Sequence, residues 1–95
     1  MRKLRQAARR DTNEAEIIAA LRKIGASVVQ LSVPNVPDLL VGFTDPTTSE
    51  PSNVLMEVKY GRNPLEAGQQ AFIEAWQGQV FVVYSIEDAL EAIGR

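Results

Sequence analysis

The stretch PDLLVGFTDPTTSEPSNVLMEVKY, residues 37–60, decides the fold. It holds two largely apolar runs, residues 39–43 and 54–60, on either side of a polar segment, residues 44–53, that contains two prolines. Apolar runs of this length are typical of buried strands, and a polar segment with prolines is typical of a loop. Residues 37–60 therefore predict two strands joined by a hairpin loop.

On the N-terminal side of this stretch, the pattern predicts a further strand and a helix. Residues 26–33 are rich in valine and leucine and predict a strand, and residues 34–37 form a turn with two prolines. Before them, a helix is predicted over residues 12–24 and ended by Gly25, because apolar residues recur there at helical spacing: Ile17, Ile18, Leu21 and Ile24.

On the C-terminal side, the pattern predicts a helix, a strand and a last helix. Asn63-Pro64-Leu65-Glu66 is typical of a helix start, with the asparagine as cap, the proline first and the glutamate as reciprocal capping partner. The apolar stripe of this helix runs to Gly78, and we expect three aromatic side chains to pack in the core: Phe72, Trp76 and Phe81. Residues 79–84 predict a strand, and Ser85 caps the final helix.

The predicted order of elements is α-β-β-β-α-β-α. The three middle strands can meander antiparallel, and the crossover through the next helix brings the last strand in parallel. The prediction is an α/β (α+β) fold with a mixed central sheet flanked by helices. A chain of 95 residues points to one domain, which we place at residues 11–95.

The composition limits the chemistry of any site. The chain has no cysteine and no histidine, which excludes disulfides, thiolate metal sites and the commonest general base. Any bound metal must be held by oxygen, which suits Mg²⁺ or Mn²⁺. No apolar run approaches the roughly 20 residues of a membrane span, and no signal peptide pattern is present. We therefore expect a cytoplasmic protein without a membrane partner.

Charge is distributed unevenly along the chain. The net charge is −2, yet residues 1–10 hold five of the ten basic side chains and no acidic one: Arg2, Lys3, Arg5, Arg9 and Arg10. Residues 1–10 are interpreted as a basic N-terminal arm, whose flexibility the sequence leaves open. Two interpretations of its role are possible. The arm contacts nucleic-acid phosphates, with Arg9 and Arg10 as candidates, or it is a frayed and solvated terminus.

One constellation of charged residues can support catalysis. Glu57 and Lys59 share a face of their predicted strand, while Val58 points into the opposite layer. If the two strands pair across the loop, Asp38 lies near Glu57, although spacing alone does not set that register. Two neighbouring carboxylates repel each other, and a divalent cation relieves the repulsion. With Lys59 to orient a water molecule or neutralise a phosphate, this set supplies what phosphodiester hydrolysis needs.

Each of these residues also has a purely structural interpretation. Asp38 follows a proline and could bond local backbone amides, as aspartates in turns do. Glu57 and Lys59 could form the solvent-facing side of an edge strand, although charges are uncommon in so aliphatic a strand.

The ordered motifs resemble those of a known nuclease superfamily. Pro37-Asp38 followed about twenty residues later by Glu57-Val58-Lys59 resembles the PD-(D/E)XK nucleases. Further motifs resemble its VRR-NUC branch, small stand-alone members of which occur in phages and bacteria: Glu14-Ala15-Glu16-Ile17-Ile18, Leu21-Arg22, Gly25-Ala26, Pro37 to Gly42, the Leu65…Gln69…Phe72…Trp76 run and Val80 to Tyr84. The resemblance covers roughly residues 11–94 and implies a restriction-endonuclease-like core.

The resemblance also implies roles for individual residues. Asp38 and Glu57 would be metal ligands, with the backbone carbonyl of Val58 as a third oxygen. Lys59 would be the catalytic lysine, and Gln69 the helix glutamine that lines the active site. The implied activity is a DNA endonuclease that depends on Mg²⁺ or Mn²⁺ and leaves 5′-phosphates. Small relatives and the archaeal Holliday-junction resolvases suggest a flapped or branched substrate. A homodimer is expected, because so small a nuclease has little surface to grip DNA.

Several assignments remain open between alternatives. The first-helix acid is Glu14, which shares the apolar face, or Glu16, and either could instead serve the helix start. Gln69 lines the site or is a satisfied core amide. Arg62 contacts a phosphate or is a solvated loop arginine.

The sequence departs from the family pattern in two places. Asn35-Val36 stands where a glycine often precedes Pro-Asp, and Glu66-Ala67-Gly68 stands before Gln69 where a Thr-Pro-Asp-like start is common. Two rival functions also remain: a non-cleaving nucleic-acid-binding module on the same fold, and a structural or protein-binding role.

Overall fold

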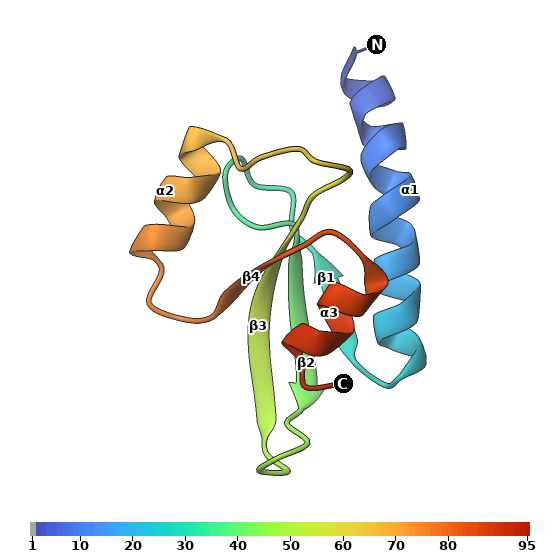
Figure 1. Cartoon of the computed structure of the whole chain (residues 1–95), viewed down its shortest axis with the longest axis vertical. Coiled ribbons are helices and arrows are strands. Elements are labelled where there is room, and N and C mark those ends of the chain that lie inside the picture. The colour runs from blue at the N-terminus through green and yellow to red at the C-terminus, as the bar shows by residue number, and fades with distance from the viewer. Residues whose placement is uncertain (1) are drawn as a thin grey trace.

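The computed structural model describes the backbone of residues 2–95 and the side chains of residues 13–95. Within this part of the chain, three helices and four strands follow one another in the predicted order (Figure 1). Their bounds are α1 Arg2–Lys23, β1 Ser27–Gln30, β2 Leu39–Thr44, β3 Pro51–Val58, α2 Ala67–Ala75, β4 Val80–Val83 and α3 Ile86–Ala92. The protein is a small α+β domain with a mixed sheet.

Helix α1 is longer than the predicted helix over residues 12–24. Its backbone is helical from Arg2, so residues 2–10 continue α1, while the side chains of Arg9 and Arg10 lie outside the described residues. Residues 2–10 consist of arginine, lysine, leucine, glutamine and alanine, all strong helix formers. At the other end, Gly25 has φ +97°, and its N–H donates to the Arg22 carbonyl at 3.0 Å. A glycine in this conformation ends a helix without steric cost, as predicted.

The four strands form one sheet in the order β1-β2-β3-β4. The first three strands pair antiparallel, and β4 pairs parallel with β3, as the meander and the crossover predicted. Strand β1 ends at Gln30, three residues before the predicted limit, and β3 begins at Pro51, three residues before Val54. The hairpin loop is therefore short, and Asp45 closes it by donating its N–H to the Glu50 carbonyl at 2.8 Å.

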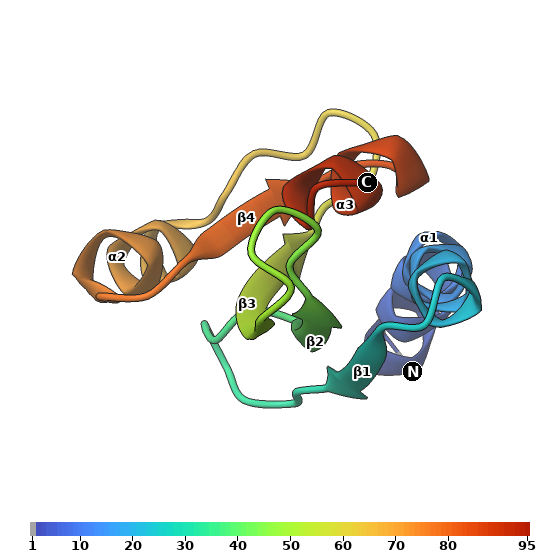
Figure 2. The same ribbon diagram turned by 90° about the horizontal axis from the view of Figure 1, so that it is seen from below.

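The main core lies between one face of the sheet and two helices. Helices α1 and α3 cover that face together, and α2 lies on the other side of the sheet (Figure 2). The core residues come from both helices and all four strands: Ile17, Ile18, Leu21, Ala26, Val28, Leu39, Val41, Val54, Met56, Val58, Val83, Ala89 and Ile93. Alternation along β3 therefore sends Val54, Met56 and Val58 into this core and leaves Leu55 and Glu57 on the opposite face.

Helix α2 differs most from its prediction. It begins at Ala67 with Glu66 as its N-cap, not at Pro64 after Asn63. The reason is a turn before it, in which the Asn63 N–H donates to the Tyr60 carbonyl at 3.2 Å and Gly61 has φ +63°. The reciprocal capping partner is Gln69 and not Glu66, because the Glu66 N–H donates to Gln69 Oε1 at 2.9 Å.

The aromatic residues pack less deeply than expected. No residue of α2 is buried, and Trp76 is 49% exposed, so its assignment to the core was wrong. Its ring stacks on Phe72 with 5.2 Å between ring centroids. Phe81 is partly buried and packs against the core, and Ser85 caps α3 by accepting from the Asp88 N–H at 3.1 Å.

Candidate active site

The register of β2 against β3 brings two carboxylates together. Leu39 is the cross-strand partner of Met56, and the next residue outward on each strand is Asp38 and Glu57 respectively. Both acids are buried, at 6% and 3% exposure. A buried carboxylate is costly unless polar groups or ions compensate it, so this pair at the end of a hairpin needs compensation.

Asp38 is tied to the neighbouring strand. Its Oδ2 accepts a hydrogen bond from the Val58 N–H at 2.8 Å, across twenty positions of the sequence. This bond differs from the local turn bonds of the structural alternative, because it fixes the carboxylate against β3, next to Glu57.

Lys59 follows at the end of β3 and is half-buried. Its N–H donates to the Val83 carbonyl at 2.9 Å, and its carbonyl accepts from Asn13 Nδ2 at 2.8 Å. The backbone at Lys59 is thus held by β4 on one side and by α1 on the other. Since Val58 packs in the core, Lys59 lies on the same side of the strand as Glu57, as predicted.

The acids of the first helix are separated by burial. Glu14 is buried and Glu16 is exposed, which agrees with the helical spacing that placed Glu14 on the apolar face. A capping role for either is wrong, because α1 begins at Arg2 and both lie in its interior. Glu14 Oε2 accepts from Gln30 Nε2 at 2.9 Å. The adjacent bond from Asn13 to Lys59 brings this turn of α1 to the end of β3.

Gln69 connects α2 to the carboxylate pair. Its Nε2 donates to Glu57 Oε2 at 3.2 Å, while its Oε1 accepts from the Glu66 N–H. Because the capping bond uses the amide oxygen, the amide nitrogen is the end that faces Glu57. Gln69 therefore joins the start of α2 to a buried acid.

Two segments that are distant in the sequence, the turn before Asp38 and the start of α2, meet in space. A Cβ atom added to Gly68 would collide with the side chain of Asn35, which lies in the turn before Asp38. Asn35 itself has φ +68°, a left-handed conformation that asparagine tolerates better than most residues. The glycine in α2 thus leaves room for the asparagine in the turn, and the pair seats α2 beside the site.

The donor set determines which metal these residues fit. Asp38, Glu57 and the Val58 carbonyl offer oxygens alone, and the chain has no histidine or cysteine to add, which suits Mg²⁺ or Mn²⁺. Among residues 13–95, no group of three or more acidic side chains is gathered closely enough to hold an ion. Glu14 therefore does not form a three-carboxylate cluster with the pair, and water would have to complete the coordination.

Two polar residues of this region were not predicted as part of the site. Asn13 lies four and eight residues before Ile17 and Leu21 and so shares their buried face. Gln30 lies two residues after Val28 and shares its face toward α1, where it meets Glu14. In both cases helical or strand spacing carried the signal.

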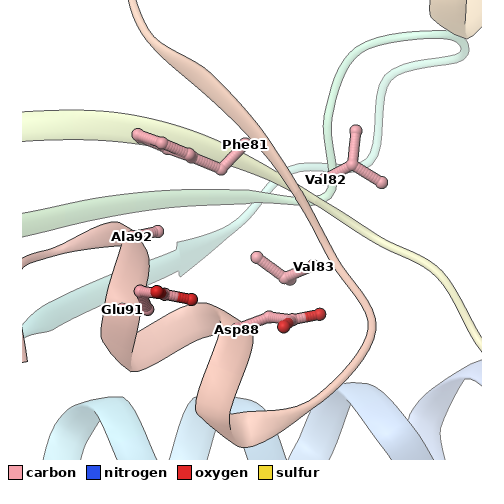
Figure 3. Close-up of a pocket in the computed structure, with 6 residues that line it drawn as sticks. All are labelled: Phe81, Val82, Val83, Asp88, Glu91 and Ala92. Carbon is pink, nitrogen blue, oxygen red and sulfur yellow. The ribbon is translucent and has the colours of Figure 1, made fainter.

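Other features lie apart from the carboxylate pair. Arg62 is exposed in the loop between β3 and α2. An open hollow lies between β4 and α3 (Figure 3), and none of the candidate site residues lines it: Phe81, Val82, Val83, Asp88, Glu91 and Ala92. Asp88 in this hollow already accepts from the Tyr84 N–H at 2.9 Å. Nothing in the sequence pattern predicted the hollow.

Comparison with known proteins adds no further assignment. Within the described part of the chain, no helix combines the length and apolar character needed to cross a bilayer. No protein-family model, no curated protein and no solved structure matches the chain.

Proposed function

We propose that this protein is a divalent-metal-dependent DNA endonuclease built on a restriction-endonuclease-like core. The observation that carries the proposal is the strand register that sets buried Asp38 opposite buried Glu57, two residues before Lys59. Asp and Glu are rarely buried, and titratable groups gathered in unusual surroundings cluster at functional sites. The motif resemblance over residues 11–94 supports the same activity.

The residues fit a hard cation held by oxygen. Asp38, Glu57 and the backbone carbonyl of Val58 would hold Mg²⁺ or Mn²⁺. Such an ion, when bound, lowers the pKa of a water molecule and stabilises negative charge on a phosphate.

The protein side chains would prepare this chemistry. The Val58 N–H holds one oxygen of Asp38, and Gln69 Nε2 holds one oxygen of Glu57. Both carboxylates are thus oriented before substrate arrives. The Lys59 ammonium would orient the attacking water or neutralise a phosphoryl oxygen. Glu14, held by Gln30, would complete the polar wall on the α1 side.

The proposal is tested by cutting assays on defined DNA. Labelled linear duplex, single strand, flap and four-way junction are incubated with Mg²⁺, Mn²⁺ or EDTA. We expect metal-dependent cutting that Asp38→Asn and Lys59→Ala each lower by about 10²–10³-fold, the usual effect of removing one group that stabilises developing charge.

A matched pair on α1 separates the site from general charge effects. Glu14→Gln is expected to lower cutting, while Glu16→Gln, exposed on the same helix, leaves it unchanged. The preferred DNA structure among the four would define the substrate class, and light scattering would test the proposed homodimer. If no DNA is cut, and wild type and variants bind DNA equally well, the proposed nuclease activity is wrong.

That outcome would favour the second candidate, a non-cleaving nucleic-acid-binding module. The absence of a three-acid group among residues 13–95 is the observation in its favour. Thermal unfolding with and without Mn²⁺ separates the two functions. A metal site that exists only in the folded protein raises its stability by about 2.7 kcal/mol at a hundredfold excess over Kd. Wild type should gain this stability and Asp38→Asn should not, whereas a binding module would gain none.

A further inference from the structure

The ends of β3 and β4 next to Lys59 present two exposed aromatic rings. Tyr60 is 48% exposed and Tyr84 is 40% exposed, and Arg62 lies exposed in the same loop as Tyr60. A single exposed tyrosine is ordinary on a protein surface. Two exposed rings and an exposed cation on the segments that adjoin Lys59 have the chemistry that binds nucleotides.

The strand register places Tyr84 beside Lys59. The Lys59 N–H donates to the Val83 carbonyl at 2.9 Å, which continues the parallel ladder in which Val58 opposes Val83. In a parallel ladder a residue bonds to the neighbours of its cross-strand partner, so Lys59 is opposite Tyr84. In Figure 1 β4 passes across β3, and the strand pairing makes the two strands neighbours in the sheet.

Tyr84 is also held in a fixed position. Its hydroxyl donates to the Asn63 carbonyl at 3.1 Å, and its N–H donates to Asp88 Oδ2 at 2.9 Å. The Asn63 N–H in turn donates to the Tyr60 carbonyl, so the ring of Tyr84 is tethered to the loop that carries Tyr60 and Arg62. A ring that is fixed in advance loses little conformational entropy when a base stacks on it.

We propose that Tyr84 is a positioning residue that stacks on an unpaired base next to the scissile phosphate, with Arg62 on a neighbouring phosphate. The substrate class is then DNA with unpaired nucleotides at the cleavage point, such as a single strand or a flap. The inference rests on the proposed function, because it places the strand to be cut beside Lys59. Bases inside a continuous duplex already stack on each other and offer no free face to the ring.

The test measures binding without cutting. A fluorescent oligodeoxythymidylate of about 15 nucleotides and a duplex of the same length are titrated with the full chain in EDTA, and anisotropy gives Kd. We expect Tyr84→Ala to weaken single-strand binding by roughly tenfold, the usual loss of one base–aromatic stack, with duplex binding unchanged. Tyr84→Phe keeps the ring and should bind the single strand nearly as well as wild type.

Trp76→Ala is the matched control, since it removes another exposed ring from the far end of α2 and should change neither affinity. Equal weakening of both DNAs by Tyr84→Ala would overturn the inference. So would a Tyr84→Phe variant as weak as Tyr84→Ala, because the hydroxyl bond to Asn63 would then be what matters. Cutting assays with the same variants separate the two proposals. Suppose Tyr84→Ala still cuts in a metal-dependent way and with the same ratio of flap to duplex cleavage as wild type. The nuclease proposal would then stand, and the proposed role of Tyr84 would be wrong.

Discussion

Helices α1 and α2 carry apolar residues at similar spacing, yet only α1 buries them. Ile17 and Leu21 of α1 are completely enclosed, whereas Phe72 of α2 is half-buried and Trp76 is half-exposed. The difference comes from the layers, because α1 packs on the sheet together with α3, while α2 lies alone on the other side. An apolar stripe therefore predicts a helix, but only the tertiary arrangement decides whether that stripe is enclosed.

The two helices also meet the candidate site through different contacts. Helix α1 brings a buried polar pair, Asn13 and Glu14, down onto the strand ends. Helix α2 reaches Glu57 by a single amide, Gln69, and rests on the turn that holds Asn35. We expect changes at the apolar positions of α1 to act mainly on stability. Changes at Glu14 or at the start of α2 should act mainly on the carboxylate site.

The largest effect is expected where the two helices differ most in burial. Leu21→Ala should lower the free energy of unfolding by about 2–5 kcal/mol, because it leaves a cavity under α1. Trp76→Ala on α2 should cost about 1 kcal/mol or less, the value of its stacking on Phe72. Urea unfolding followed by circular dichroism measures both. Similar losses for the two variants would mean that α2 is packed far more tightly than its exposure indicates.

A smaller effect is expected at the polar contact between α1 and β3. Asn13→Ala removes the hydrogen bond to the Lys59 carbonyl and should cost about 1–3 kcal/mol, because that carbonyl loses its partner on the α1 side. Glu16→Ala, exposed on the same helix, should stay within about 0.5 kcal/mol of wild type. The same urea titrations apply, and an Asn13→Ala variant as stable as Glu16→Ala would contradict the contact.

The contrast between the two helices also explains what the sequence could predict. The order of elements and the buried face of Glu14 followed from periodicity, because α1 and the strands pack into one core that repeats those periods. The pairing of Asp38 with Glu57 did not follow, since the register of a hairpin depends on its turn type and exact loop length, and the sequence pattern left both open. In the structure β3 begins at Pro51 and Asp45 closes the loop, and these two features set the register.

The predicted start of α2 was wrong for a related reason. Asn63-Pro64 has the local features of a helix start, but the turn from Tyr60 to Asn63 and the bond from the Tyr84 hydroxyl hold Asn63 in the loop. These contacts join residues that are distant in sequence, and no local pattern reports them. The residue that does cap α2, Glu66, is an uncommon cap, and its bond with Gln69 became visible only in the structure.

The smallest and sharpest effect is expected where α2 rests on the turn before Asp38. Gly68→Ala has two opposed consequences. The new Cβ collides with the Asn35 side chain, which costs about 1 kcal/mol, at the low end for overpacking because that side chain is exposed and can shift. Alanine also favours the helix over glycine by about 0.8–1 kcal/mol. In the wild-type background the two terms nearly cancel, so the net change in stability should be close to zero.

Removing Asn35 should separate the two terms. Asn35→Gly suits the left-handed φ of +68° and removes the atoms that the new Cβ would meet. In that background Gly68→Ala should raise the free energy of unfolding, by up to about 1 kcal/mol, because only the helix preference remains. A double-mutant cycle in urea measures the difference as a coupling energy, for which contacting residues usually give at least about 0.5 kcal/mol. If Gly68→Ala has the same effect in both backgrounds, α2 does not rest on this turn in solution. The hydrogen bond from Gln69 to Glu57 would then also be in question, because it depends on the position of α2.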